Sequence, residues 1–391
     1  MQFFHKSQAR LRLARLLDRI RLRSDIIHFP GNWVKLLPHG GDFFPALFAA
    51  IDSAVSHVCI EFYTIRADTT GRILSTTVKE AAARGVFVAI VYDALGCFDT
   101  PESYWADLRR AGVQCLPFNP PSFAGIHLLD IRDHRKLVLI DGQIAFLGGL
   151  NVGDEYSGYG DSYARWRDVG IRLDGPAVGE LQQIFEVTWV RLGGQTLMMS
   201  SCKREAKQGD ADVVIVNGRP HKNRPLIRNA FRIAMSGAEK HIQIITPYFV
   251  PGPRVVRSLL RAVRRGVWIQ IILPSISDVP VVKIVGRAYL KPLLEAGVEI
   301  YERQGTILHA KVMSVDCRWV TLGSANLDFR SFHRNFEINV IIASRPFGRQ
   351  IDTLFNEELG KSRRIDLKEY DSRGWFERFC ERLLAPLGRF L

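Results

Sequence analysis

Closely spaced cysteines are missing from this 391-residue sequence. Its six cysteines are scattered along the chain, at Cys59, Cys97, Cys115, Cys202, Cys317 and Cys380. A disulfide framework is unexpected in a chain of this length, and a zinc ribbon needs cysteines only a few residues apart. The spacing therefore predicts reduced thiols, as in a cytoplasmic protein.

Long hydrophobic runs are also missing. The longest uncharged apolar stretches, Ile242–Pro253 and Gly266–Ser277, are too short to span a bilayer and contain Pro or Gly. The N-terminus does not form a secretory signal, because its basic residues run through the segment instead of preceding an apolar block. We therefore expect a protein that is soluble or lies on a membrane surface.

Acidic residues are the minority among the charged ones. The 40 Asp and Glu residues stand against 53 Lys and Arg residues, which gives a formal net charge of +13. A positive field of this size attracts polyanions, either nucleic acid or an anionic membrane. Hydrophobic residues make up 47% of the sequence, which is typical of a folded protein, and the length favours two domains.

The sequence does contain an internal repeat. A helix that ends at a glycine before an apolar strand is expected at Gly85 and Gly266, and again at Gly112 and Gly297. Paired His-x-Lys-(x4)-Asp motifs and paired Gly-x-x-Asn turns follow in the same order. The His-to-His and Asn-to-Asn offsets are both 175 residues (309 − 134 and 326 − 151), which is hard to obtain by chance.

Each half alternates strands and helices, which predicts an α/β domain with a largely parallel or mixed sheet covered by helices. Periodicity lapses and charges cluster in Ser200–Asp210, so we place the domain boundary there. The prediction is a first domain at residues 31–200 and a second at 211–365, facing one another. A basic N-terminal segment (1–30) and a C-terminal helix (366–391) flank them.

The motif is typical of phosphate chemistry. Each His-x-Lys pair lies in an apolar run that predicts a strand, so His134 and Lys136 should project from one face, as should His309 and Lys311. A neutral imidazole attacks phosphorus or moves a proton, while the ammonium stabilises charge on phosphoryl oxygens. A single such pair is usually incidental, but two copies in matched surroundings are not.

The doubled motif resembles the phospholipase D superfamily. Within it, Thr246–Pro251, Gly323–Phe332 and Asn335–Glu337 are similar to segments of bacterial cardiolipin synthases of the type without transmembrane segments. The resemblance covers roughly Trp33 to Ile342. It implies two α/β/α sandwich domains related by a pseudo-twofold axis, which join two half-sites in one cleft and need no metal or other cofactor.

The resemblance also implies residue roles. His134 and His309 form the reacting pair, with His134 as nucleophile and His309 as acid and base. Lys136, Lys311, Asn151 and Asn326 hold the phosphoryl oxygens. Asp168 and Glu337 match the places of the carboxylates that orient the imidazoles, a need that follows independently from fixing the tautomer.

Other candidates are less defined. Asp141 and Asp316 complete the motifs but lie an odd number of steps from the histidines, so we expect structural roles, with basic partners behind the site. Glu61, Tyr63 and Tyr248 end strands beside the cleft and either recognise glycerol hydroxyls or form a core-edge aromatic with a capped carboxylate. Ser324 is a further candidate substrate contact; Gly149 holds its place in the first half.

Both ends of the chain have amphipathic patterns. Leu13, Leu16, Leu17 and Ile20 fall at helical spacing among arginines, and a C-terminal stripe combines Phe376, Phe379, Leu383, Leu387 and Phe390 beside Trp375. Pro386 should bend or end that helix. Basic amphipathic helices suit an anionic membrane surface, although packing on the domains or on another subunit is the alternative.

The residues alone predict phosphodiester transfer through histidine, and the resemblance implies a phosphatidyltransferase, which we expect at the cytoplasmic face of the bacterial inner membrane. The resemblance implies transfer of a phosphatidyl group between two phosphatidylglycerol molecules, with an anionic membrane as partner and no nucleic acid. The alternatives are a hydrolase of the same superfamily, acting on lipid or nucleic acid, and an inactive lipid-binding scaffold. The oligomeric state and the acceptor alcohol are left open, a dimer being compatible with the sequence.

Overall fold

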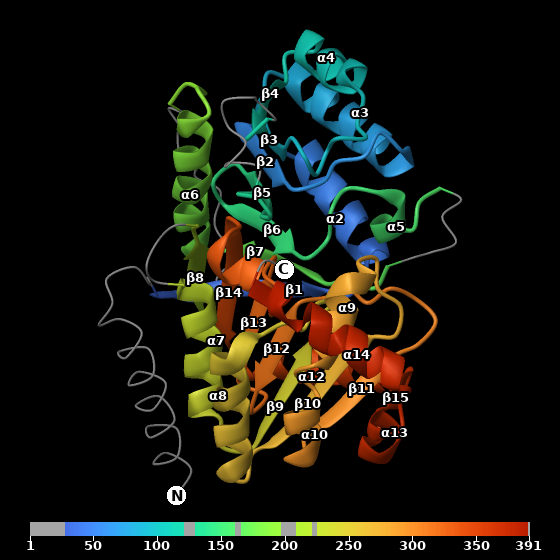
Figure 1. Ribbon diagram of the computed structural model, residues 1–391. Coiled ribbons are helices and arrows are strands. Elements are labelled where there is room, and N and C mark those ends of the chain that lie inside the picture. The colour runs from blue at the N-terminus through green and yellow to red at the C-terminus, as the bar shows by residue number, and fades with distance from the viewer. Residues whose placement is uncertain (1–27, 121–129, 161–165, 197–208, 221–224, 390–391) are drawn as a thin grey trace, which may run out of the picture.

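The computed structural model describes residues 28–120, 130–160, 166–196, 209–220 and 225–389 (Figure 1). The predicted N-terminal helix and Phe390 lie outside these residues. The first half contains seven strands and five helices in the described residues: β1 His28–Leu37, α2 Gly40–Asp52, β2 His57–Phe62, α3 Thr69–Ala83, β3 Phe87–Asp93, α4 Glu102–Arg110, β4 Gln114–Phe118, β5 Lys136–Ile140, β6 Ile144–Gly148, α5 Asp154–Ser157, β7 Gly170–Asp174 and α6 Ala177–Arg191.

The second half repeats this order and extends it at the C-terminus. Its elements are β8 Ala211–Gly218, α7 Leu226–Gly237, β9 His241–Ile245, α8 Gly252–Arg264, β10 Trp268–Pro274, α9 Pro280–Arg287, α10 Lys291–Glu295, β11 Glu299–Arg303, β12 Val312–Val315, β13 Trp319–Gly323, α11 Phe329–His333, β14 Glu337–Ala343, α12 Arg345–Leu359, β15 Ser362–Arg364, α13 Leu367–Asp371 and α14 Trp375–Leu384. A 3-10 helix, Ala385–Arg389, follows α14. The single helix predicted for 366–391 is therefore divided into α13 and α14, and α14 ends at Leu384, just before Pro386, where a bend or an end was predicted.

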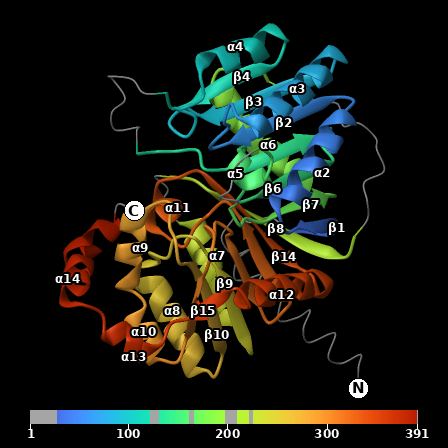
Figure 2. The same cartoon turned by 90° about the vertical axis from the view of Figure 1, so that its right-hand side faces the viewer.

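All fifteen strands form one sheet, in the order β15-β11-β10-β9-β12-β13-β14-β8-β1-β7-β6-β5-β2-β3-β4. Apart from the edge strand β15, which has no counterpart, the order of equivalent strands is the same outward from the β8–β1 pair in both directions, which gives the predicted pseudo-twofold repeat. The pairs β2–β3 and β9–β10 are parallel while β5 and β12 run antiparallel to their neighbours, so the sheet is mixed. Figure 2 shows the two halves meeting at β1 and β8.

Strand β1 begins at His28, ahead of the predicted start of the first domain at residue 31. It pairs with β8 through His28 and Val214 and with β7 through Trp33 and Asp174. The two halves are therefore joined edge to edge by backbone hydrogen bonds, and not only face to face.

The four glycines of the repeat have the backbone conformation that the sequence predicts. Gly85, Gly112, Gly266 and Gly297 lie between a helix and the following strand with φ between 82° and 89°. A side chain is strained in this left-handed region, so glycine ends each helix and turns the chain into the next strand.

Three hydrophobic clusters hold the layers together. Helices α6 and α12 pack on one face of the sheet in a core shared by both halves, which includes Leu181 and Ile351. The other face is covered separately, by α2, α3 and α4 over the first half and by α7, α8 and α10 over the second. The shared core fixes the two halves relative to one another, which a site built from both requires.

Candidate active site

The two motif histidines lie just before strands β5 and β12, at the contact between the halves. The predicted strands were too long at this end, because they begin only at Lys136 and Val312. The backbone at the histidines pairs across the molecule instead. The His134 amide donates to the Phe336 carbonyl (2.9 Å) and the His309 amide donates to the Arg167 carbonyl (2.7 Å).

Each histidine ring contacts a carboxylate from the other half. His134 Nδ1 lies 3.0 Å from Glu337 Oε1, and His309 Nδ1 lies 2.6 Å from Asp168 Oδ2. A carboxylate at Nδ1 selects the tautomer with a proton on that nitrogen and leaves Nε2 free to react. The predicted carboxylates are thus at the predicted rings, but each belongs to the opposite half-site.

Burial sets the charge state of the rings. Desolvation lowers the pKa of His134 to about 4, helped by Lys136 and opposed by Glu337. Desolvation, followed by Lys311, also lowers the pKa of His309. Burial therefore favours the neutral form of both imidazoles before substrate binds, and the neutral form is the nucleophilic one.

The motif lysines lie beside the rings and are buried. Lys136 Nζ donates to the His134 carbonyl (2.8 Å), and Lys311 Nζ lies 2.7 Å from His309 Nδ1 and 3.1 Å from His309 Nε2. Desolvation lowers the pKa of Lys136 to about 7 and that of Lys311 to about 8, and the charge of Lys311 contributes to the shift at Lys136. An anionic phosphate between them would favour the charged form of both, so the pair is suited to bind a phosphodiester.

Glu337 is held by two further side chains. Ser324 Oγ donates to Glu337 Oε2, and Asn335 Nδ2 donates to Oε1 over 3.2 Å. Ser324, predicted to contact substrate, is instead fully buried behind His134. In the first half, a Cβ on Gly149 would lie 2.2 Å from Asp168 Oδ1. The carboxylate of Asp168 therefore occupies the space that a serine side chain at position 149 would need. This explains why the first half has Gly149 where the second half has Ser324.

The two motif asparagines are both buried but are not equivalent. Asn151 Nδ2 donates to the Tyr156 hydroxyl (2.9 Å), and its Oδ1 accepts from the Thr64 amide (3.3 Å). Asn326 Oδ1 has no hydrogen-bond partner. Asn326 is accordingly the asparagine with spare capacity for a ligand.

Aromatic rings surround the histidines. Tyr63 lies 5.1 Å from the His134 ring, and Tyr248 lies 6.5 Å from the His309 ring, both centroid to centroid. The sequence did not identify Tyr156 and Trp166, whose rings lie 5.5 and 5.3 Å from that of His309. Only the proximity of Trp166 to Asp168 in the chain gave any signal for them.

Asp141 and Asp316 lie at the opposite ends of β5 and β12 from the histidines. Asp141 accepts from the backbone amides of residues 55–57, and Asp316 accepts from those of residues 239–241. The predicted basic partners were wrong, because the carboxylates bind main-chain amides. Their structural role agrees with the prediction, and it separates them from the reacting groups.

Glu61 lies on β2 opposite Leu137 of β5, and its carboxylate contacts Arg135. It is completely buried, and its Oε1 accepts from Arg135 Nη1 (3.0 Å), whose guanidinium also donates to Thr188 and Asn217. The sequence left two interpretations of Glu61 open, a contact with glycerol hydroxyls and a capped carboxylate at the edge of the core. The geometry fits the second, because Arg135 caps the carboxylate. We therefore do not assign Glu61 to the substrate.

One set of possible metal ligands occurs among the described residues, away from the histidines. Ligand atoms of His241, Cys317 and Asp352 lie within 4.8 Å of one another. His241 begins β9 and Cys317 follows β12, so the set lies at the strand ends remote from His309. It is not placed to act in the reaction at the paired histidines.

Comparison with known proteins agrees with this geometry. A family model described as "Cardiolipin synthase, PLD-like domain" matches residues 47–189 and 231–359, one segment in each half. A cardiolipin synthase of Geobacillus sp. (strain WCH70) is 35% identical over 90% of this chain and 72% of its own length. Cardiolipin synthase 2 of Bacillus anthracis is 34% identical over 98% of this chain and 75% of its own.

Solved structures support the fold. The phosphatidylserine synthase of Haemophilus influenzae Rd KW20 superposes with a TM-score of 0.67 at 13% identity, covering 91% of this chain and 92% of that one. A polyphosphate kinase of Porphyromonas gingivalis gives a TM-score of 0.59 at 14% identity, over 92% of this chain and 53% of its own. With two matched segments, a cross-paired histidine site and relatives over most of its length, the chain belongs to the cardiolipin synthase family, a family of phosphatidyltransferases in the phospholipase D superfamily.

Proposed function

We propose that this enzyme makes cardiolipin from two phosphatidylglycerol molecules and releases glycerol, through a phosphohistidine intermediate. The observation that carries the proposal is the pair of imidazoles, each held at Nδ1 by a carboxylate of the other half. Two such rings beside two buried lysines supply a nucleophile, a proton carrier and charge stabilisation for one phosphodiester.

His134 is the proposed nucleophile. Its side chain is 12% exposed and that of His309 is 5% exposed, so His134 is the more accessible to an incoming phosphorus. Its Nε2 attacks the phosphorus of the first phosphatidylglycerol, and the bond from phosphorus to the glycerol oxygen breaks. Imidazolium at His309, supported by Asp168 and by the bound phosphate, protonates the departing glycerol.

The second step reverses these roles. Neutral His309 takes the proton from a glycerol hydroxyl of a second phosphatidylglycerol, and that oxygen attacks the phosphorus. The phosphorus–nitrogen bond breaks, the two phosphatidyl groups share one glycerol, and His134 is again neutral. Lys136 and Lys311 hold the non-bridging oxygens in both steps, together with Asn326.

The C-terminal helix supports a place at the membrane. Trp375, Phe379 and Leu383 on α14 are 74%, 53% and 63% exposed, although they are large apolar side chains. The helix is fixed by Leu384, which packs on Val250 and Val285 near the wall of the site that carries Tyr248. An exposed apolar stripe beside the site would let donor lipids keep their acyl chains in the bilayer.

No helix in the described parts of the chain is long and apolar enough to cross a membrane. The basic composition favours the anionic cytoplasmic leaflet.

The test is lipid mass spectrometry after incubation of purified protein with phosphatidylglycerol vesicles. Cardiolipin and glycerol should form in equal amounts with wild type and should be lost in His134→Ala and His309→Ala. Intact-protein mass spectrometry after neutral quenching should show one added phosphatidyl group that His134→Ala lacks. Phosphatidic acid as the only product would replace the proposal by hydrolysis, and unchanged lipid would rule out both.

A further inference from the structure

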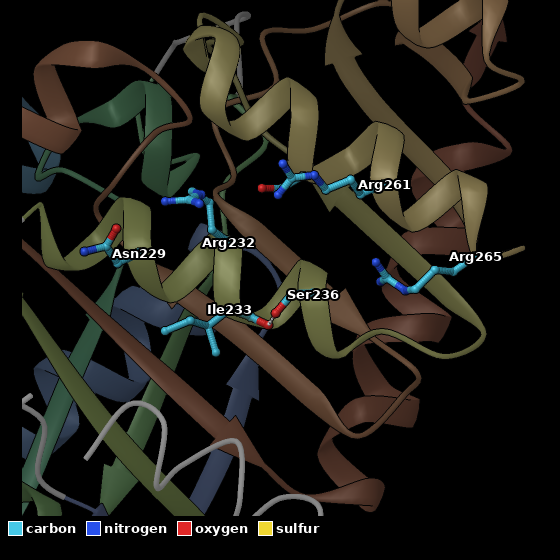
Figure 3. Close-up of a pocket in the computed structure, with 7 residues that line it drawn as sticks. Asn229, Arg232, Ile233, Ser236, Arg261 and Arg265 are labelled. Atoms are coloured by element: carbon cyan, nitrogen blue, oxygen red, sulfur yellow. Dashed lines mark hydrogen bonds between the residues drawn. The ribbon is translucent and has the colours of Figure 1, made fainter. Parts of the chain in front are cut away.

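Helices α7 and α8 present an unusual concentration of arginine. Together with the first residue after α8 they carry seven arginines and no acidic residue: Arg228, Arg232, Arg254, Arg257, Arg261, Arg264 and Arg265. The two helices enclose a cavity of about 320 Å³. Figure 3 shows Arg232 on α7, Arg261 on α8 and Arg265 just after α8 around it, and Asn229 and Ser236 also line it.

The lining of this groove contains three arginines and no acidic residue. No carboxylate of the described residues forms an ion pair with Arg228, Arg232, Arg254 or Arg261, and the Nε atoms of Arg228 and Arg232 are buried without a hydrogen-bond partner. Arg265 donates only to main-chain carbonyls, those of Met235 (2.9 Å) and Ala238 (3.3 Å). A buried donor without an acceptor is costly, so the groove is suited to take up an anion.

Neighbouring groups respond to this uncompensated field. Burial, followed by Arg254 and Arg232, lowers the pKa of Arg228. Burial, followed by Arg228 and Arg254, lowers the pKa of His333 to about 4. His333 Nε2 lies 2.9 Å from Arg228 Nη1 and is a neutral acceptor, which relieves none of the charge. Like charges are therefore held together at a cost that a bound anion would offset.

The groove is separate from the reacting histidines. Ser236 and Arg265 lie near the start of β9, whereas the site lies beyond the other end of that strand. The helices α7 and α8 cover the same face of the second half as α10, and Figure 2 shows α9 and α14 continuing that layer. The exposed apolar stripe of α14 thus belongs to the helical layer that carries the arginines.

Charge selects among possible occupants. The N-terminal residues 1–27 contain seven basic residues against Asp18 and Asp25, so the groove repels that segment. Phosphate groups are the preferred partners of clustered guanidinium groups, and an anionic lipid surface is attracted by arginine. A volume of about 320 Å³ accommodates a phosphoglycerol headgroup, since a water occupies about 30 Å³.

We propose that the α7–α8 groove is a second anionic-phospholipid site, which binds the phosphate headgroup of membrane phosphatidylglycerol and holds the enzyme on the bilayer. It rests on the proposed function only in taking the same lipid class. Arg232 and Arg261 are its main anion ligands, and Arg265 also fixes the end of α7. The site binds lipid without reacting with it, because no histidine, cysteine or carboxylate lines it to act as a nucleophile or to activate its serines.

The experiment measures co-sedimentation of the full chain with vesicles of phosphatidylcholine alone or mixed with phosphatidylglycerol. Arg232→Gln/Arg261→Gln should weaken partition to the mixed vesicles by roughly ten- to thirtyfold, and turnover of a soluble short-chain phosphatidylglycerol should be unchanged. The matched control is Arg345→Gln/Arg349→Gln, which removes the same charge from exposed positions on α12, on the opposite face of the sheet. The control should lose less than about threefold.

Equal losses in the two double variants would overturn the proposal, since any basic residue would then serve. Equal partition of the wild type to vesicles with and without phosphatidylglycerol would also overturn the proposal. So would a groove variant that keeps vesicle binding and loses binding to single-stranded DNA. Failure to form cardiolipin would refute the proposed function without affecting the vesicle result, so the two proposals fail separately.

Discussion

His309 and Asp168 lie in different halves of the chain, yet His309 Nδ1 is 2.6 Å from Asp168 Oδ2. The mirror pair, His134 and Glu337, joins the halves in the opposite direction at 3.0 Å. Neither half alone contains a histidine with its carboxylate. The repeat therefore produces one site from two incomplete ones, and catalysis depends on the contact between the halves.

Asp168→Asn should reduce kcat roughly a thousandfold, because the amide no longer selects the Nδ1-protonated tautomer of His309 or stabilises its imidazolium. The measurement is cardiolipin formation at saturating phosphatidylglycerol, with circular dichroism to confirm the fold. Glu337→Gln should act in the same way through His134. Turnover within threefold of wild type in either variant would contradict the assigned positioning role.

The motif aspartates behave differently in this structure. Asp141→Ala leaves the amides of Val55, Ser56 and His57 without their buried acceptor, so the free energy of unfolding should fall by about 2–4 kcal/mol. Urea denaturation measures this loss. Turnover well below the unfolding transition should stay close to wild type, and a specific loss of kcat in a fully folded variant would show that Asp141 acts in the chemistry.

Glu61 provides a test of a buried ion pair against a substrate contact. Glu61→Ala leaves the Arg135 guanidinium without its carboxylate in the interior, which should cost about 3–5 kcal/mol of folding free energy. The KM for phosphatidylglycerol in the milder variant Glu61→Gln should equal that of wild type. A raised KM with unchanged stability would restore Glu61 to the substrate site.

The pKa shifts predict how activity depends on pH. The pKa of His134 is about 4, so the neutral nucleophile should persist well below pH 6.5 and kcat/KM should fall only as pH approaches 4. The lysine pKa values, about 7 and about 8, mean that the free enzyme loses phosphate-binding charge as pH rises through that range. Burial lowers the pKa of His309, so its acid form is lost at lower pH, and loss of the lysine charges should make kcat/KM fall further from about pH 7 upward.

The profile is measured with a soluble short-chain phosphatidylglycerol, which avoids changes in vesicle surface charge. Lys136→Arg, which keeps its charge, should move the alkaline limb upward even if the maximal rate is lower. A flat kcat/KM from pH 7 to pH 9 would contradict the lowered lysine pKa values.

The free energy of unfolding should also depend on pH. The folded pKa of His134 lies below its unfolded value, so the unfolded state binds more protons and stability falls as pH drops from about 6.5 to 4.

Much of this architecture follows from the sequence because the repeat is exact where chemistry and turns require it. The 175-residue offset identified His134 with His309 and Asn151 with Asn326, and the positive-φ glycines marked the helix ends. The side chains that contact these residues were harder to predict from the sequence. The cross-pairing of Asp168 with His309 spans 141 positions, and local order places Asp168 equally well beside His134.

Burial was the other property that the sequence did not reveal. Glu61 and Ser324 look like cleft residues because they end strands next to the motif. One is neutralised by Arg135 and the other supports Glu337. The edge pairing of β1 with β8 likewise depends on a long-range contact, which no period or spacing within the chain specifies.

The exposed stripe of α14 should contribute to membrane binding independently of the arginine groove. Phe379→Ser/Leu383→Ser removes two apolar side chains that are 53% and 63% exposed, and partition to phosphatidylglycerol vesicles should weaken by roughly ten- to a hundredfold. The matched control is Val187→Ser/Val190→Ser on α6, where the side chains are 55% and 44% exposed on another helix. Turnover of the soluble substrate should be unaffected in both. If the α6 control lost as much binding, general surface hydrophobicity and not α14 would hold the enzyme at the bilayer.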